Sequence, residues 1–185
     1  MKRAIFFAAC VISVIAIAAR ADDVTDTLNS ALEAYEEGDL QYALEELEYA
    51  KQLMLTQKTD ALTGYLPPAP DGWRREINTE INASLGMMGG GVGAEAEYSG
   101  GGDSFTLSIF ADNPMVAAMS AMISNAAVMG MKVERIGREK FAIQDNTVQG
   151  LIDNRILVKA EGGDVAMMLS VLEEIDYREL GQFGN

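Results

Sequence analysis

The feature that most constrains the fold of this chain is a change of hydrophobic period at the proline-rich segment "PPAP" (67–70). Before this segment, apolar residues recur every three or four positions, which is the spacing of one face of an α-helix. After it, apolar and polar residues alternate, which is typical of β-strands with one buried face. Because proline cannot continue a helix, the helical part must end here. The sequence therefore predicts a helical segment followed by a separate domain built on a sheet.

The segment 22–66 predicts a hairpin of two helices. The first is expected to begin near Asp23 and to end at Gly38, and the second to run from about Leu40 to Thr63. The pattern of small and large residues resembles one tetratricopeptide repeat, in which small residues let two helices cross closely. Leucines occupy positions where that family often has aromatic residues. The residues that carry the resemblance are Ala31, Gly38, Leu40, Ala43, Leu47 and Ala50.

A single repeat of this kind leaves an apolar face without a partner. Such repeats usually need about three stacked copies to bury their faces, and only one copy is visible in the sequence. We therefore expect the hairpin to dock either on the sheet domain of its own chain or on another protein.

The segment 67–185 predicts an α+β domain. Its pattern indicates an antiparallel sheet of about six or seven strands packed by two helices. The order of the elements, with "PDGW" (70–73) entering the first strand, resembles Mog1/PsbP-like domains, and this resemblance implies an accessory or binding role. The whole arrangement also resembles exported bacterial proteins. Strands are expected at 73–81, 92–98, 104–110, 132–137, 139–145, 148–152 and 156–162, a loop at 85–93, and helices at 114–130 and 164–180.

The first 21 residues have the pattern of a signal peptide. Lys2 and Arg3 precede an apolar run over 4–19, and small residues occupy the two positions that a signal peptidase reads before a cut after Ala21. The run is shorter than the roughly 20 residues that span a bilayer. We therefore expect a periplasmic or secreted protein with no membrane span after cleavage. A retained anchor and a lipid on Cys10 are the alternatives.

The chain beyond Ala21 is strongly acidic. All 28 acidic residues and 11 of the 14 basic ones lie there, which gives that part a net charge of −17. Such a field repels nucleic acid and anionic lipid surfaces, and it favours a cationic protein or a metal ion. Solubility alone is the simpler explanation. Cys10 is the only cysteine, so cleavage would remove all thiol and disulfide chemistry.

The segment 113–133 carries five methionines. Thioethers can bind Cu(I), and one face of a helix would collect several of them. The surrounding residues are also apolar, which is typical of a buried helix, so we interpret the segment as core. Met87 and Met88, beside three glycines, are a candidate for an adaptable apolar contact. The residues on the shared face are Met115, Met119, Met122, Ala126 and Met129.

We predict no catalytic, cofactor-binding or metal-binding residues. The chain has no histidine, which removes the usual serine triad and zinc sites. The segment "GGGVG" (89–93) lacks the lysine and hydroxyl residue of a phosphate-binding loop. Asp112, Asp145 and Asp153 each precede an asparagine without the spacing of a calcium loop, so we interpret them as turn residues.

These observations predict a non-catalytic periplasmic binding or accessory module that acts through contacts with an unidentified protein. A periplasmic binder of a small ligand or of a metal, Cu(I) or calcium, is the alternative, and a hydrolase-type activity of unpatterned carboxylates is a weaker one. Trp73, at the start of the sheet domain, is either a contact residue or part of the core. The residues expected to contact a partner are Glu36, Glu37, Glu45, Glu48, Met87, Met88 and Trp73.

Overall fold

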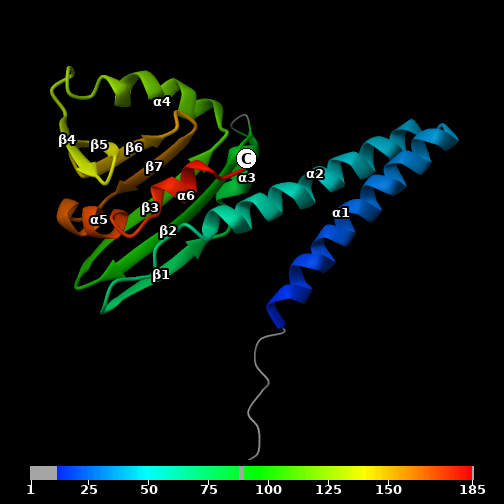
Figure 1. Cartoon of the computed structure of the whole chain (residues 1–185), viewed down its shortest axis with the longest axis horizontal. Coiled ribbons are helices and arrows are strands. Elements are labelled where there is room, and N and C mark those ends of the chain that lie inside the picture. The colour runs from blue at the N-terminus through cyan, green and yellow to red at the C-terminus, as the bar shows by residue number, and fades with distance from the viewer. Residues whose placement is uncertain (1–11, 88–89, 185) are drawn as a thin grey trace, which may run out of the picture. The chain divides into compact units, whose positions relative to one another are not determined.

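A computed structural model describes residues 12–87 and 90–184 of the chain (Figure 1). The chain divides into two compact units between Gln57 and Lys58. The first contains helix α1 (Ile12–Glu37) and most of helix α2 (Leu40–Thr63). The second contains the last turns of α2 and a sheet with its own helices. The expected α+β class is therefore confirmed.

Helix α1 begins earlier than expected, at Ile12 instead of near Asp23. No glycine or proline interrupts the chain between Ile12 and Glu37, so one helix continues from the apolar run into the acidic segment. Ala21 lies inside this helix. The cleavage after Ala21 stays a prediction.

The turn between α1 and α2 is built as the sequence predicts. Gly38 has a positive φ of 87°, and its N–H donates to the carbonyl of Tyr35. The Asp39 carboxylate then accepts the N–H of Tyr42 at 3.1 Å, which caps the first turn of α2.

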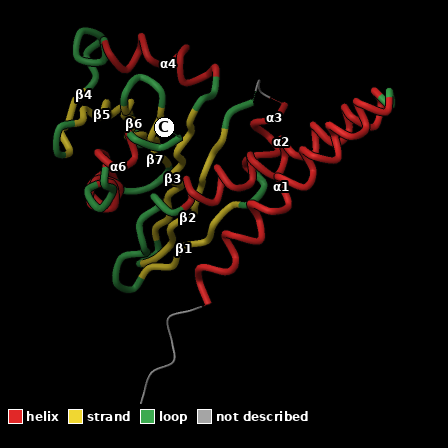
Figure 2. The backbone as a smooth tube through the Cα atoms, turned by 45° about the vertical axis from the view of Figure 1, so that its right-hand side comes forward, coloured by secondary structure: helices red, strands yellow, loops and turns green. Residues whose placement is uncertain are grey.

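The second unit is built on a seven-stranded sheet in which every neighbouring pair is antiparallel. Figure 2 shows the strands of this sheet in yellow. The strand order is β1-β2-β3-β7-β6-β5-β4, so the pairing of β3 with β7 lies at the centre. The strands are β1 (Trp73–Asn78), β2 (Val92–Gly100), β3 (Asp103–Ala111), β4 (Lys132–Ile136), β5 (Glu139–Gln144), β6 (Thr147–Ile152) and β7 (Ile156–Glu161).

Helices cover both faces of this sheet. Phe110 of β3 packs with Val116 of α4 (Pro114–Ser124) in one buried cluster. Phe105 points to the other face, because side chains alternate along a strand, and it stacks on Tyr98 with 4.9 Å between ring centres. Phe141 on that face contacts Tyr177 at the start of α6 (Tyr177–Gly181).

The first predicted strand is too long, and a short helix was missed. The strand ends at Asn78, whose side chain accepts the N–H of Glu80 in a turn. Helix α3 (Ile81–Met87) follows, where we expected strand and then loop. Ile81 and Leu85, one turn apart, both pack in the buried cluster with Phe110, and this tertiary contact favours the helix.

The two later helices are shorter than expected. Helix α4 ends at Ser124, and turns follow to Gly130. The last helix is broken into α5 (Val165–Leu172) and α6. Asp176 accepts the N–H of Glu179 and so begins a new helix. The carbonyl of Leu172, at the end of α5, accepts the Tyr177 hydroxyl at 2.7 Å and the N–H of Ile175 at 3.3 Å.

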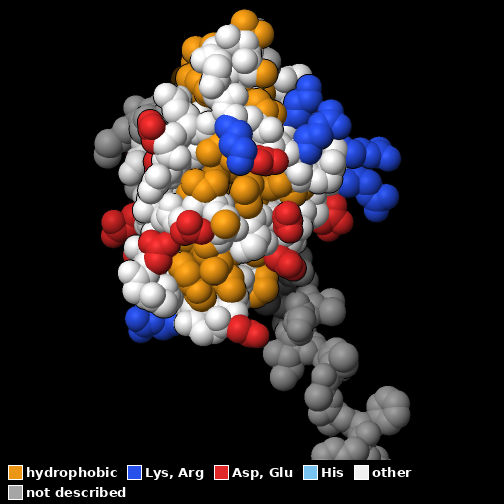
Figure 3. All heavy atoms as spheres, turned by 90° about the vertical axis from the view of Figure 1, so that its left-hand side faces the viewer, with side chains coloured by type: hydrophobic (Ala, Val, Ile, Leu, Met, Phe, Trp, Pro, Cys, Tyr) orange, Lys and Arg blue, Asp and Glu red, His pale blue; other side chains and the backbone are white. Residues whose placement is uncertain are grey.

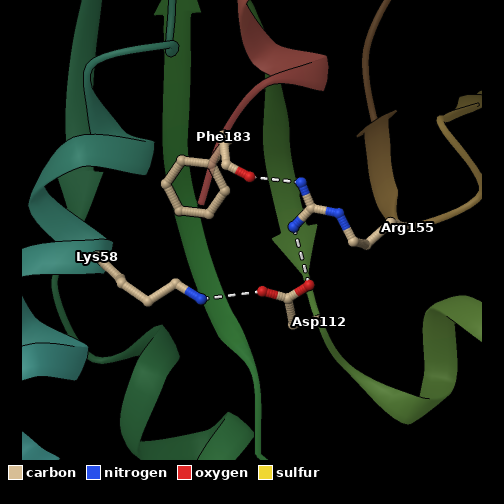
Figure 4. A network of polar contacts seen from close by, with 4 residues as sticks. All are labelled: Lys58, Asp112, Arg155 and Phe183. Carbon is tan, nitrogen blue, oxygen red and sulfur yellow. Dashed lines mark hydrogen bonds and ion pairs between the residues drawn. The ribbon is translucent and has the colours of Figure 1, made fainter. Parts of the chain in front are cut away.

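Polar contacts tie the end of α2 to the sheet within the second unit (Figure 4). Lys58 and Arg155 each place a nitrogen 2.9 Å from an oxygen of Asp112, and Arg155 also donates to the carbonyl of Phe183. Burial alone would raise the pKa of Asp112, but hydrogen bonds from the two cations outweigh it and hold this pKa below its ordinary value. This network joins four segments that are distant in sequence.

Candidate docking surface on the helical hairpin

An open groove lined almost wholly by apolar side chains runs along the hairpin. It has a volume of about 470 Å³ and lies entirely within the first compact unit. Each helix contributes residues at spacings of three and four, which is one face of each helix. We name it the hairpin groove; its lining residues are Leu28, Ala31, Leu32, Tyr35, Leu40, Ala43, Leu44 and Leu47.

The groove exists because small residues, and not large ones, fill the contact between α1 and α2. Each of the four alanines at this contact is at most 4% exposed. Alanine lets the helices approach closely, so the large side chains next to it are pushed to the outside of the contact. The buried alanines are Ala31, Ala34, Ala43 and Ala50.

The large residues of the groove are exposed to an unusual degree. Leu32 is 56% exposed, and Tyr35 and Leu44 are each 63% exposed. Leaving apolar area in water costs roughly 25 cal/mol per Å², so a contiguous row of such residues is unfavourable unless something covers it. Apolar surfaces of this kind mark sites of interaction in soluble proteins.

Acidic residues border the groove on both helices. Glu36 lies four residues after Leu32, and Glu48 lies four residues after Leu44, so each carboxylate is next to a groove leucine. Hydrogen bonds from Gln52 and Lys51, with the charge of Lys51, hold the pKa of Glu48 below its ordinary value. The groove thus has one carboxylate at its border on each helix.

The other two predicted glutamates lie differently. Glu45 is one position beyond Leu44, farther from the groove, and accepts a hydrogen bond from Gln41 at 2.8 Å. Glu37 is three residues after the buried Ala34, and the helical period places it on the side of α1 away from Leu32. The border of the groove therefore uses Glu36 and Glu48 most directly.

Trp73 belongs to the second unit and packs within it. Its ring lies 5.8 Å from the ring of Phe105, at the end of the sheet. A Cβ added at Gly100, its partner on β2, would come within 2.6 Å of the indole, so the glycine makes room for the ring. This half-buried tryptophan serves the packing of the sheet.

The two methionines proposed as contacts fall at the edge of what the structure describes. Met88 lies outside the described residues. Met87 is the last residue of α3, and its side chain is also outside the description.

The methionine-rich helix is only half buried, contrary to the expectation of a helix buried all round. Met119 and Ile123 pack against the cluster around Phe110, whereas Ala117, Ala118 and Ala121 are exposed. Met129 lies in the turns after α4 and is 60% exposed. Because α4 lies on the sheet with one face, none of the described residues buries its other apolar face. The side chain of Met115 is not described.

The aspartates considered for calcium serve in turns. Asp112, Asp145 and Asp153 all have φ near +50°, a left-handed conformation that aspartate tolerates, and Asn154 does too. Among residues 12–87 and 90–184, no three histidine, cysteine, aspartate or glutamate side chains meet in a way that could hold a metal ion.

A polar hollow of about 390 Å³ lies over β1, β2 and β3. Glu76 and Glu97 face each other there as a cross-strand pair. The Glu95 carboxylate, also in this hollow, accepts hydrogen bonds from Asn78 and Ser108 at 2.8 and 2.7 Å. These contacts tie the edge strand to the sheet.

Apolar and charged side chains are unevenly distributed over the sheet unit. Figure 3 shows apolar side chains exposed from the top to the bottom of the face that it presents, and basic side chains gathered mainly at its upper right edge. The hairpin, in contrast, has nine acidic residues and one basic residue between Asp23 and Gln57. These 35 residues thus have a net charge of −8, the same as the 128 residues of the second unit, so the hairpin has the higher density of negative charge.

Comparison of the chain with models of protein families, with curated proteins and with solved structures finds no match. Of the helices in the described part of the chain, none combines the length and the apolar character that a bilayer crossing demands.

The sequence did not single out the groove leucines as contact residues. We assigned the contacts on the hairpin to Glu36, Glu37, Glu45 and Glu48 instead. The available signal was the repetition of alanine at the crossing positions, which indicates that the helices pack through small side chains and leave the leucines outside.

Proposed function

We propose that this chain is a non-catalytic binding or accessory module that works outside the cytoplasm through protein–protein contacts. The hairpin groove is its contact surface. The observation that carries this proposal is the row of exposed leucines with Tyr35 in one groove. The signal-like N-terminus supports the location.

In this proposal, the hairpin and the sheet unit have different roles, which follow from the families that they resemble. The hairpin, similar to one tetratricopeptide repeat, supplies the binding face. The sheet unit, similar to Mog1/PsbP-like domains, supplies a stable body with a large buried core. In this scheme the fold holds a surface in place and no residue performs a chemical step.

A small apolar ligand is the less favoured occupant. The volume of the groove falls in the range of ligand pockets, about 300–1,000 Å³. Such pockets have a few converging polar groups, however, and of the described residues that line this groove Tyr35 alone has a polar side-chain atom. An open apolar groove fits a protein segment better.

Site-specific photo-crosslinking in living cells tests the proposal. A photoreactive amino acid replaces Leu44 in the groove or, as the control, Tyr42, which is exposed on α2 but two positions away and therefore on another side. We expect the probe at position 44 to capture a defined protein and the probe at position 42 to capture none. The same capture should be lost with Leu32→Gln.

Two results would contradict the proposal. The first is equal crosslinking from positions 42 and 44, which would show that partners do not contact the groove in preference to the rest of α2. The second is a product confined to the chain itself, which would show that its own sheet unit covers the leucines.

A further inference from the structure

The geometry points to a particular occupant for the hairpin groove: an amphipathic helix of a partner protein, with lysine or arginine on both sides of its apolar stripe. This inference rests on the proposed function and adds the chemistry of the partner. Docking of such a helix would complete a bundle of three helices.

The shape of the groove favours a helix over an extended segment. Its walls run from Leu28 to Tyr35 on α1 and from Leu40 to Leu47 on α2. Each wall is about 10 Å long at 1.5 Å per residue. A helix with apolar residues at positions i, i+3 or i+4, and i+7 presents a stripe of matching length.

The apolar character of the groove also favours a helix over an extended segment. An extended segment would bring its backbone N–H and C=O groups against the leucines, where they would find no partner. A helix satisfies these groups internally and exposes only side chains. Leucine, isoleucine or phenylalanine side chains of the partner would then fill the spaces between the two rows.

The charges beside the groove select a cationic partner. Glu36 and Glu48 border it on opposite helices, in a hairpin with nine acidic residues and one basic residue between Asp23 and Gln57. A second copy of the hairpin would bring the same negative borders together. Complementary charge mainly controls which partners are accepted and how fast they associate.

Synthetic helical peptides provide the probe. The first is an amphipathic peptide of about 20 residues, long enough to form a helix, with leucines on one stripe and lysines beside it. The second has glutamates in place of the lysines, and the third has the same composition as the first with its leucines scattered. Fluorescence anisotropy with the purified chain measures their Kd values.

Four variants of the chain serve as matched pairs. Leu32→Gln with Leu44→Gln removes the apolar walls, and Tyr42→Gln with Tyr49→Gln removes exposed apolar residues outside the groove. Glu36→Gln with Glu48→Gln neutralises the borders, and Glu33→Gln with Glu37→Gln neutralises the far side of α1. All these positions are exposed, and circular dichroism verifies that each variant is folded.

We expect the lysine peptide to bind at least about tenfold more tightly than the glutamate peptide at low salt. Binding should weaken when the NaCl concentration rises from about 0.02 to about 0.3 M, since salt screens the border charges. The wall variant should lose binding, and the border variant should weaken it more than the far-side variant. The scattered peptide should bind poorly.

Equal binding of the two charged peptides, or binding that survives loss of the walls, would overturn this inference. A dimer that forms in sedimentation at the same concentrations and dissociates on Leu44→Gln would assign the groove to a second copy and also overturn it. If no peptide binds but the cellular crosslink at position 44 persists, the proposed function holds and the cationic helix is wrong.

Discussion

At the scale of single residues, the second unit depends on a few side chains that join distant segments. Asp112 is the clearest case, because two cations from distant segments, Lys58 of α2 and Arg155 of the β6–β7 turn, converge on its carboxylate. Its backbone has a positive φ of 56°. Aspartate and asparagine tolerate this backbone better than other residues with side chains. Position 112 thus needs a residue that tolerates a positive φ and that also carries a negative charge.

Replacing Asp112 by asparagine separates these requirements. In the folded chain, the pKa of Asp112 lies below its ordinary value of about 4. The ionised carboxylate therefore stabilises the fold fully above the ordinary pKa. This contribution disappears as the pH falls through the pKa of the folded chain. Asp112→Asn should cost at most about 1 kcal/mol at pH 7, because the network is partly solvated. Urea unfolding at pH 7 and at pH 3 measures the effect.

The sign of the pH dependence is the decisive part of that experiment. The difference in unfolding free energy between the native chain and Asp112→Asn should shrink at pH 3. A constant difference at both pH values would show that the charge of Asp112 does not contribute.

Gly150 allows a second test at this scale. It pairs with Phe141 across β5 and β6, and a Cβ there would lie 2.6 Å from the aromatic ring. Gly150→Ala should therefore destabilise the chain by about 1–3 kcal/mol, the usual cost of overpacking. Thermal unfolding of the purified variant gives the value, and an unchanged melting temperature would mean that the ring moves aside freely.

At the scale of elements, local patterns predicted the strands well and the helices less well. Alternation in "AEAEY" and "SFTLSIF" marks β2 and β3 because each strand has one strongly apolar side. Helix α3 was missed because "INASLGM" is only two turns long and its apolar residues suit either period. Its position depends on contacts with Phe110 and Gly93, which are distant in sequence and cannot be read locally.

Asn82 anchors α3 to β2 and tests that explanation. Its side-chain amide donates to the carbonyl of Gly93 and accepts the N–H of the same residue, both at 2.9 Å. Asn82→Ala should cost about 1–3 kcal/mol, since both backbone groups lose their partner. The unfolding free energy of Asn82→Asp, which keeps only the acceptor, should lie between those of the native chain and Asn82→Ala. Denaturant unfolding distinguishes the three chains, and equal stability would contradict this role.

In the hairpin, enlarging a buried small residue should cost more stability than replacing an exposed large residue. Ala50→Leu, at a fully buried position of the helix contact, should cost about 1–3 kcal/mol in hairpin stability. Leu44→Gln, at a position 63% exposed, should change stability by less than about 0.5 kcal/mol. Helix content followed by circular dichroism during thermal unfolding compares the two. A larger loss for Leu44→Gln would show that this leucine is already covered.

At the scale of the whole molecule, the chain combines two units with different sources of stability. The sheet unit buries large side chains such as Tyr98, Phe141 and Leu107, whereas the hairpin buries mainly alanines. The helical and the alternating parts were visible in the sequence because their periods differ. The pairing of β3 with β7 was not, because nothing in a local pattern states which distant strand is the neighbour.

Hydrogen exchange should reveal this difference between the units. The amides of α1 and of residues 40–50 should exchange faster than those of β3 and β7, because the alanine contact provides little burial. The amides around Leu62, which is fully buried in the second unit, should be protected although they belong to the same helix α2. Mass spectrometry of peptic fragments resolves these segments. Uniform protection along α2 would contradict the prediction.

The central position of the β3–β7 pair also governs how the chain can fold as it is synthesised. The hairpin of β2 and β3 is complete once residue 111 has been made, but the other edge of β3 stays open until residues 156–161 arrive. During that interval an apolar strand offers unpaired backbone groups to any other strand nearby. A nascent or truncated chain that ends before β7 is therefore the form most exposed to aggregation, and β7 acts as the closing segment of its folding.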